Sequence, residues 1–228
     1  MSASPGAAQD TPDEPRTVTV QGEGTVTAAP DQATVRFGIV TEAETAEAAR
    51  AQNATASKNA MNAVRDLGIE ETKIQMQRLQ LQPRREYNRQ TREYEEKGYE
   101  ARRQVVVELD SLEQLPTLVT RVVQQGANRL DGIQYALSDR ETVRNEALRA
   151  AAQSARAKAQ LLAETLGAQL GPVQQINEQS FDFPRPVYRA QREMAKAATA
   201  DQAAPEPDAY AAGEIEVSAS VQVTFELR

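Results

Sequence analysis

The pattern of apolar and polar residues predicts that the chain begins with two β-strands. From residue 18 to residue 40, apolar and polar positions alternate with the period of two that is typical of half-buried strands. One face of the first strand carries only valine and glycine: Val18, Val20, Gly22, Gly24 and Val26. The stretch "AAPDQ" separates it from a second alternating run: Ala33, Val35, Phe37 and Ile39. We therefore expect a β-hairpin whose turn is longer than the two-residue optimum.

Three later stretches predict helices. The first helix is expected at about residues 44–67, because Thr41 and Glu44 have the spacing of a capping box and Gly68 is placed to end the helix. The second is expected at about 113–125, where its apolar residues form one stripe.

The third predicted helix, at 138–166, is long and rich in alanine. It begins with "SDRE", in which Ser138 and Glu141 have capping-box spacing, and it ends before Gly167. Its expected buried stripe consists mostly of small residues: Val143, Ala147, Ala151, Ala155, Leu162 and Leu166. Small side chains allow a helix to approach a neighbouring element closely, so we expect tight packing along this stripe.

A long charged β-hairpin is expected between the first two helices. The stretch "KIQMQRLQLQP" alternates, but the parity of its apolar residues shifts between Met76 and Leu79, which indicates a bulge or a change of face. Residues 84–103 mix acidic and basic side chains, and they include three tyrosines: Tyr87, Tyr94 and Tyr99. Charges of both signs are typical of a solvated surface, so we interpret this segment as the exposed arms and tip of the hairpin.

The C-terminal part combines an irregular insert with the clearest strand of the chain. Residues 181–213 are rich in Pro and Ala and show no regular period, which is unusual inside a domain. The last strand has one apolar face: Ile215, Val217, Ala219, Val221, Val223, Phe225 and Leu227. At the other end, residues 1–15 predict a disordered tail, and their small residues are compatible with the remnant of an export signal.

These elements predict an α+β fold: a mixed or antiparallel sheet with three helices, one of them long and Ala-rich, and a long charged β-hairpin. We expect residues 16–228 to form one domain of two intertwined lobes. The first hairpin, the first helix and the charged hairpin are assigned to one lobe. The other two helices and the last strands are assigned to the second.

The composition excludes several kinds of catalytic and metal-binding site. The 228 residues include no His and no Cys, which excludes Ser–His and Cys–His catalysis and the ligands of structural zinc sites. The composition still allows a site made of carboxylates alone, as in a glycosidase or a Mg²⁺ or Ca²⁺ site. The net charge of −7 argues against nucleic acid or an anionic membrane as the main partner. No apolar run approaches the ~20 residues of a membrane-spanning helix.

Gly22-Glu23-Gly24 resembles the start of a dinucleotide-binding motif but lacks its other features. Thr27 occupies the place of the third glycine, and the next element is a strand instead of a helix. Glycine inside a strand more often marks a bulge or a close backbone approach. We predict that the two glycines leave one face of the strand bare and that helix 138–166 lies against it. We expect no catalytic residue, no metal site and no cofactor.

Two segments are candidate interaction surfaces. Tyr87, Tyr94 and Tyr99 alternate with basic residues, as in a surface on which nucleic-acid bases stack, but five glutamates neutralise most of that positive charge. Arg185 and Tyr188 belong to "RPVYRAQREMAKAATA", which is compatible with a short basic amphipathic helix on a partner or a membrane. A disordered linker fits its few apolar positions better.

Six stretches of the chain, in order, resemble the SIMPL-domain family of bacterial periplasmic and outer-membrane-associated immunogenic proteins, whose eukaryotic relatives were named for binding a pelle-like kinase. They are "VTVQGEGTVTAAPDQATVRFGI", "MNAVRDLGI", "KGYEARRQVVVEL", "QGANRLDGIQYALSD", "EALRAAAQSARAKAQLLAETLGAQLG" and "GEIEVSASVQVTFEL". The resemblance implies an exported envelope protein with an α+β fold and a tendency to form homo-oligomers. It also implies stress protection or adaptor roles, and it carries over no catalytic residue.

We therefore expect a non-catalytic periplasmic or envelope protein that acts through homo-oligomerisation and protein–protein interaction, without a membrane span but compatible with peripheral association. The segments 84–103 and 181–213 are the expected contact surfaces, because neither can bury a core by itself. The alternative is a protein that binds a small molecule or lipid between helix 138–166 and the sheet, where close Ala packing leaves little room. An acid-based hydrolase would need two carboxylates about 5–10 Å apart in a cleft.

Overall fold

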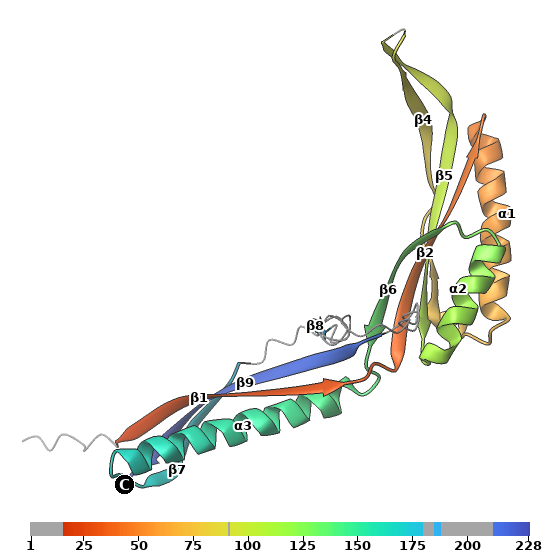
Figure 1. Cartoon of the computed structure of the whole chain (residues 1–228). Coiled ribbons are helices and arrows are strands. Elements are labelled where there is room, and N and C mark those ends of the chain that lie inside the picture. Colours follow the sequence, from red (N-terminus) through yellow and green to blue (C-terminus); the bar gives the residue numbers. More distant parts are fainter. Residues whose placement is uncertain (1–15, 91, 180–184, 188–211) are drawn as a thin grey trace, which may run out of the picture. The chain divides into compact units, whose positions relative to one another are not determined.

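The computed structural model describes residues 16–90, 92–179, 185–187 and 212–228 (Figure 1). Its helices are α1 (Ala46–Arg65), α2 (Leu115–Gln124) and α3 (Arg140–Thr165). Its strands are β1 (Thr17–Ala28), β2 (Gln32–Ala43), β3 (Ile74–Met76), β4 (Gln80–Asn88), β5 (Glu93–Leu109), β6 (Arg129–Ala136), β7 (Leu170–Glu178), β8 (Arg185–Val187) and β9 (Glu214–Leu227). The predicted α+β class and the three helices are confirmed.

The chain divides into two compact units, and each is built from segments that are far apart in the sequence. We call the first the α3 unit; its described residues are 16–27, 139–179, 185 and 216–228. We call the second the hairpin unit; its described residues are 28–90, 92–138, 186–187 and 212–215. The sequence-based assignment of elements to lobes is wrong in two places, because β1 belongs to the α3 unit and α2 belongs with α1 to the hairpin unit.

The predicted hairpin between the first two strands is wrong. β1 lies in a four-stranded sheet in which β9 is flanked by β1 and β7, with β8 also paired to β9. β2 lies in the other sheet, of order β3–β5–β2–β6, with β4 paired to β5. The alternation identified both strands correctly, but a strand's partner is chosen by the apolar faces available in the whole fold. "AAPDQ" lacks the Asn-Gly type of turn that would have locked a local pairing.

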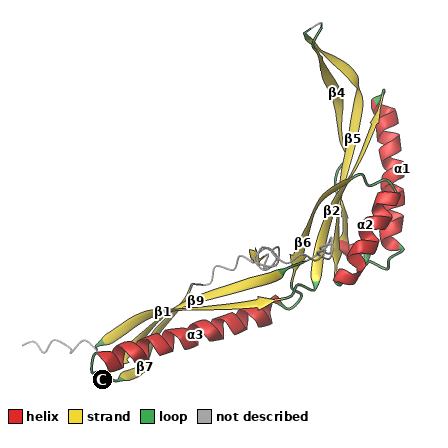
Figure 2. Cartoon of the chain, viewed as in Figure 1, coloured by secondary structure: helices red, strands yellow, loops and turns green. Residues whose placement is uncertain are grey.

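The hairpin unit has a core between its sheet and two helices. β2 and β5 pair in antiparallel register, with Val35 opposite Val107 and Phe37 opposite Val105. Helices α1 and α2 cover this face of the sheet (Figure 2). Both layers contribute fully buried side chains to the core, among them Val35, Phe37, Ile39, Val64, Val105, Val107, Leu115 and Leu118.

The α3 unit packs its helix directly on two glycines of β1. A Cβ atom on Gly22 would lie 2.0 Å from the carbonyl oxygen of Ala151, and one on Gly24 would lie 2.3 Å from that of Ala147. Real Cβ atoms do not approach this closely, so only glycine fits at either position. The predicted role of the glycine pair, a bare strand face for the alanine helix, is confirmed.

The buried stripe of α3 differs from the expected one at its C-terminal end. The buried residues follow an i, i+4 series of alanines: Ala147, Ala151, Ala155, Ala159 and Ala163. Leu162 and Leu166, which were expected on this stripe, are exposed. A side chain as large as leucine would hold the helix away from the glycines, so the close approach selects alanine instead.

The caps of α1 and α3 also differ from the predictions. Thr41 is still in β2, where its hydroxyl donates to the carbonyl of Ala49 at 2.8 Å, and Thr45 caps α1 by accepting from Ala48 N at 3.2 Å. Asp139 caps α3 by accepting from Thr142 N at 3.0 Å. In both helices the side-chain oxygen that caps the first turn comes from a residue closer to that turn than predicted. Helix ends predicted from sequence commonly differ from the structure by a few residues.

Ser138 has a different role, because it binds Asp31. The backbone N–H of Ser138 donates to one carboxylate oxygen of Asp31 at 2.8 Å, and the Ser138 hydroxyl donates to the other. The N–H of Asp31 in turn donates to Ala136 O at 3.2 Å. These bonds join the segment that precedes β2 to the segment that follows β6.

We expect Asp31→Ala to lower the free energy of unfolding by about 1 kcal/mol at neutral pH. The hydrogen bonds from Ser138 lower the pKa of Asp31, so the stabilisation is present above the unfolded-state pKa and is lost as pH falls through the folded-state pKa. Thermal unfolding of wild type and variant over an acidic pH series measures this. A difference that stays constant down to the lowest pH would contradict the role of the carboxylate.

Candidate interaction surface

The most exposed aromatic side chains of the described residues lie at the end of the β4–β5 hairpin. Tyr87 and Tyr94 stand opposite each other in the register of the two strands. Their ring centroids are 5.3 Å apart and the rings are tilted by 60°, a geometry that aromatic pairs favour. Tyr87 is 48% exposed and Tyr94 is 72% exposed. The pair therefore offers a large apolar surface that no described residue covers.

A bulge in β5 brings the third predicted tyrosine to the same face. Tyr99 stands opposite Pro83, whereas Glu96 stands opposite Arg85, so β5 has one extra residue here. Pro83 and Tyr87 share one face of β4, which places Tyr99 on the face of the tyrosine pair. Tyr99 donates a hydrogen bond to Glu96, and this bond raises the pKa of the phenol.

Gly98 makes this bulge possible. Its φ of 114° lies in the region that favours glycine, and an added Cβ would lie 2.5 Å from the carbonyl oxygen of Ala43. A bulge with these constraints is fixed in position along β5, which keeps Tyr99 on the same face as Tyr94.

The turn of the hairpin is ordered by Asn88. Its side-chain oxygen accepts from Gln90 N at 2.9 Å, and its carbonyl accepts from Arg92 N at 2.8 Å. Arg92 has a φ of 58° and is the only non-glycine residue with positive φ among the described residues. Glycine or asparagine is the usual choice at such a position, so the arginine is held in an unfavourable backbone conformation next to the tyrosine pair.

Two basic side chains of the hairpin form ion pairs. Lys97 contacts Glu95 at 2.8 Å, and Arg84 forms an ion pair with Glu42. Asn88 also donates to Glu95 at 2.6 Å. Exposed pairs of this kind contribute little stability. Tyr87 and Tyr94 are the largest exposed apolar side chains of the hairpin.

The predicted site residues are therefore only partly brought together. Tyr87, Tyr94 and Tyr99 lie on one face of the hairpin, as just described. Arg185 lies in β8, but its side chain is outside the described residues, and so is the whole of Tyr188. The predicted insert 181–213 is likewise described only at 185–187 and at its last two residues.

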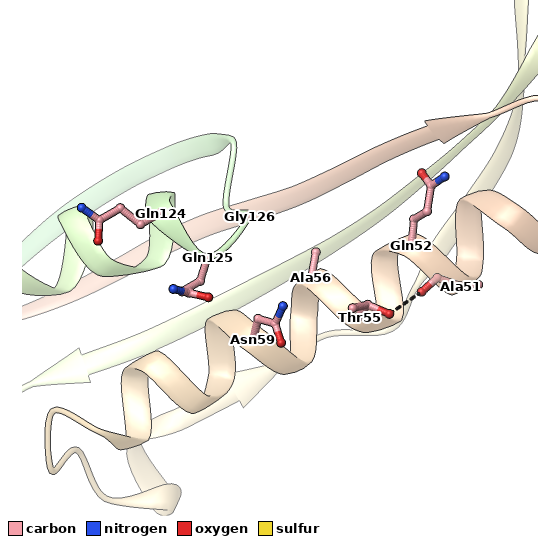
Figure 3. Close-up of a pocket in the computed structure, with 8 residues that line it drawn as sticks. All are labelled: Ala51, Gln52, Thr55, Ala56, Asn59, Gln124, Gln125 and Gly126. Carbon is pink, nitrogen blue, oxygen red and sulfur yellow. Dashed lines mark hydrogen bonds between the residues drawn. The ribbon is translucent and has the colours of Figure 1, made fainter.

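The sequence interpretation missed an open groove between α1 and the end of α2 (Figure 3). Its volume is about 610 Å³, and its lining is Ala51, Gln52, Thr55, Ala56, Asn59, Gln124, Gln125 and Gly126. No titratable side chain is among these residues. Hydroxyl and amide groups can hold a polar ligand, but they supply neither a general base nor a nucleophile with an activating partner.

The two fully buried polar side chains of the described residues have structural partners. Asn53 donates to the carbonyls of Ile39 at 2.8 Å and Ala101 at 2.9 Å, and it accepts from the Ser57 hydroxyl at 3.2 Å. The amide thereby joins α1 to both β2 and β5. Its hydrogen bonds are fully used inside the fold, so it is not a free group for a ligand.

The described residues contain neither a metal-binding cluster nor a membrane-spanning helix. No group of three or more Asp, Glu, His or Cys side chains in this part of the chain is arranged to hold a metal ion. None of the helices in the described ranges is long and apolar enough to cross a membrane.

The fold and its surfaces define a two-unit α+β protein with an exposed aromatic hairpin. Residues 18–225 match the family described as "SIMPL: Protein of unknown function (DUF541)". The chain belongs to this family, and the resemblance stated from the sequence is confirmed.

Curated relatives cover most of the chain. The 26 kDa periplasmic immunogenic protein of Brucella melitensis is 31% identical over 94% of this chain and 86% of its own length. The uncharacterized protein YggE of Escherichia coli is 28% identical over 100% of this chain and 89% of its own length. YggE of Edwardsiella ictaluri is 30% identical over 83% of this chain and 78% of its own. None of these names includes an enzymatic activity.

Proposed function

We propose that this protein is a non-catalytic component of the bacterial envelope that assembles with itself and binds other proteins. The observation that carries the proposal is the exposed tyrosine pair on the β4–β5 hairpin. Tyrosine is enriched at the energetically dominant positions of protein interfaces. A two-stranded hairpin end buries little by itself, so contact with a partner supplies the burial that Tyr87 and Tyr94 lack in the single chain.

The periplasm is the compartment that we propose for this assembly, since a relative with 31% identity is named as a periplasmic protein. We propose that the physiological role of this assembly is to protect the cell under stress. A strain lacking the gene, complemented with the wild type or with an assembly-deficient variant, tests that role. Equal survival with both would contradict a stress role that depends on assembly.

Ligand binding between α3 and the sheet is the weaker alternative. The backbone of α3 approaches Gly22 and Gly24 so closely that not even a methyl group fits at either position. A small molecule or lipid would have to separate the helix from the strand along this contact. The packing therefore favours an interaction protein over a carrier with a pocket there.

We expect the double substitution Tyr87→Ser and Tyr94→Ser to weaken assembly at least tenfold in the concentration at which half of the chains associate. The change removes two exposed rings without touching the core, so the melting temperature should change little. Light scattering coupled to size-exclusion chromatography, over a dilution series, measures the association.

Val123→Ser is the matched control, because Val123 is an exposed apolar residue of α2 outside the hairpin. It should assemble like the wild type. A wild type that remains monomeric at micromolar concentration, at low and high salt, would overturn the proposal. Unchanged association of the tyrosine variant would show that the hairpin is not a self-contact.

A further inference from the structure

A small polar pocket lies on the face of the hairpin-unit sheet that α1 and α2 do not cover. Its lining consists of arginines and glutamines: Gln77, Arg78, Gln80, Arg102 and Gln104. The two β5 residues of this lining alternate with the buried Ala101 and Val105, so they point away from the helices. The volume is about 170 Å³, whereas pockets for whole small molecules measure about 300–1,000 Å³. The pocket therefore has room for an ion or for the terminal group of a larger ligand.

The bulge predicted from the shifted parity of "KIQMQRLQLQP" forms one side of this pocket. The backbone N–H of Gln77 donates to Gln104 O at 2.9 Å, and Gln80 stands opposite Arg102. The chain between these two positions therefore has one residue more than the β5 segment that it faces, which confirms the bulge. A bulge changes the direction of its side chains, and here it brings Arg78 to the pocket.

Asp131 holds the β5 side of the pocket in place. Its carboxylate accepts from Gln104 Nε2 at 2.9 Å and from Arg129 Nε at 2.6 Å, and it lies 3.6 Å from Nη2 of Arg102. The side chain of Asp131 is only 13% exposed. Two guanidinium groups around one carboxylate leave this cluster positively charged. Because a guanidinium has five N–H donors, Arg102 keeps donors for a ligand.

The bulged side of the pocket supplies donors that have no partner in the chain. The side chains of Gln77, Arg78 and Gln80 form no hydrogen bond or ion pair with another described residue. The chain has 33 acidic and 26 basic residues, so a shortage of carboxylates does not explain an unpaired arginine. Arg78 therefore adds a second positive charge to the pocket, and the two carboxamides add N–H donors.

We propose that this pocket binds a phosphate group. The inference goes beyond the proposed self-assembly and does not depend on it. Guanidinium groups bind phosphate oxygens in pairs through charge-assisted hydrogen bonds. A tetrahedral phosphate presents oxygens in several directions, so it can accept from Arg102 on β5 and from Arg78, Gln77 and Gln80 on the bulged segment together. Inorganic phosphate and the headgroup of a phosphorylated lipid both carry this group.

The affinity of this pocket must come from its own side chains. The net charge of −7 repels anions from the protein as a whole. At physiological ionic strength, however, exposed charges farther apart than about 8 Å are largely screened from each other. A phosphate in the pocket therefore interacts mainly with the arginines that line it, and removing one of them should have a large effect.

Titration of the full chain with inorganic phosphate at constant ionic strength, followed by the phosphorus NMR line width, tests the site. We expect Arg78→Gln to raise the dissociation constant about fivefold or more, because charge-assisted hydrogen bonds are lost. Arg78 is exposed, so the circular dichroism and the melting temperature of the variant should stay as in the wild type.

Arg50→Gln is the matched control, because it changes the net charge by the same amount. Arg50 is an exposed residue of α1, the helix on the opposite face of the sheet. This variant should bind phosphate like the wild type. Equal weakening by both substitutions would overturn the pocket, since the overall charge would then explain the effect.

Gln80→Leu tests hydrogen bonding separately from charge. It removes one donor from the pocket and leaves the net charge unchanged, so the dissociation constant should rise about twofold or more. Binding as tight as that of the wild type would overturn recognition by the pocket and would leave only a diffuse attraction to Arg78.

Sedimentation with lipid vesicles distinguishes the two sources of the phosphate group. Vesicles of phosphatidylcholine are compared with vesicles that also contain phosphatidic acid. Sedimentation with the second kind alone, lost in Arg78→Gln, would assign the pocket to a lipid headgroup. Binding of inorganic phosphate without sedimentation would assign it to a soluble phosphate. A wild type that binds neither inorganic phosphate nor these vesicles overturns the inference and leaves the proposed self-assembly standing.

Discussion

Replacing Gly22 with alanine should lower the free energy of unfolding by about 3 kcal/mol, near the upper end of what overpacking a well-packed contact usually costs. The new methyl group would lie 2.0 Å from the carbonyl oxygen of Ala151 and 2.5 Å from the backbone nitrogen of Ala155. Backbone atoms of a helix cannot rotate aside as a flexible side chain does. The whole helix α3 must therefore move away from β1, and the contacts of its alanines are lost with it.

Urea unfolding followed by far-ultraviolet circular dichroism measures this effect, because the chain has no Trp to serve as a fluorescent probe. Gly38→Ala is the matched control, since Gly38 also lies inside a strand. A Cβ atom there would be 3.3 Å from Cβ of Arg129 and 3.5 Å from a carboxylate oxygen of Asp131. The control should change the stability by less than about 1 kcal/mol. A similarly small effect at Gly22 would contradict the close packing of α3.

The second large effect is expected at Asn53. Asn53→Ala removes two donated bonds, to the carbonyls of Ile39 and Ala101, and the acceptor of the Ser57 hydroxyl. Since Asn53 is fully buried, its partners cannot form replacement hydrogen bonds with water. Unsatisfied buried groups and a small cavity together should lower the free energy of unfolding by about 3 kcal/mol.

Asn53→Asp distinguishes lost hydrogen bonds from lost volume. An ionised carboxylate would face two carbonyl oxygens without a proton to donate, so burial and these oxygens would raise its folded-state pKa. The folded variant then binds more protons than the unfolded chain, and its stability falls as pH rises from about 4. Unfolding measured at acidic and neutral pH should show a deficit, relative to the wild type, that grows with pH.

Ser57→Ala is the matched control for Asn53. It removes one hydroxyl of the same buried network but leaves both bonds to the strand carbonyls in place. Its effect should be about 1 kcal/mol and independent of pH. A pH-independent deficit for Asn53→Asp would contradict the donor role that the structure gives to this amide.

The candidate surface was predictable only in part. The mixed charges and tyrosines of residues 84–103 indicate an exposed hairpin, and the structure confirms that Tyr87 and Tyr94 are exposed on it. Residues of a regular strand alternate between its two faces, so the odd spacing between Tyr94 and Tyr99 predicts that they lie on opposite faces. The bulge at Gly98 reverses this, and it depends on a close approach to Ala43 that is visible only in the folded chain.

The α1–α2 groove was not predictable, because none of its lining residues carries a local signal. Gln124 and Gln125 lie in the last turn of a predicted helix, and Thr55 and Asn59 lie on the polar face of another. Exposed glutamine and asparagine are ordinary surface residues. Their grouping results from the packing of α2 on α1, which involves contacts between residues far apart in the sequence.

The sequence by itself determined the periodicity of each strand and helix, the apolar face of the last strand and the match between two glycines and an alanine stripe. These features are local or rest on side-chain size, so the residues specify them directly. The tertiary structure decided that β1 pairs with β9 instead of β2, that α2 belongs with α1, and that Leu162 and Leu166 stay exposed. The physical reason is that alternation defines the faces of a strand, whereas its partner depends on which apolar faces and open edges the rest of the chain provides.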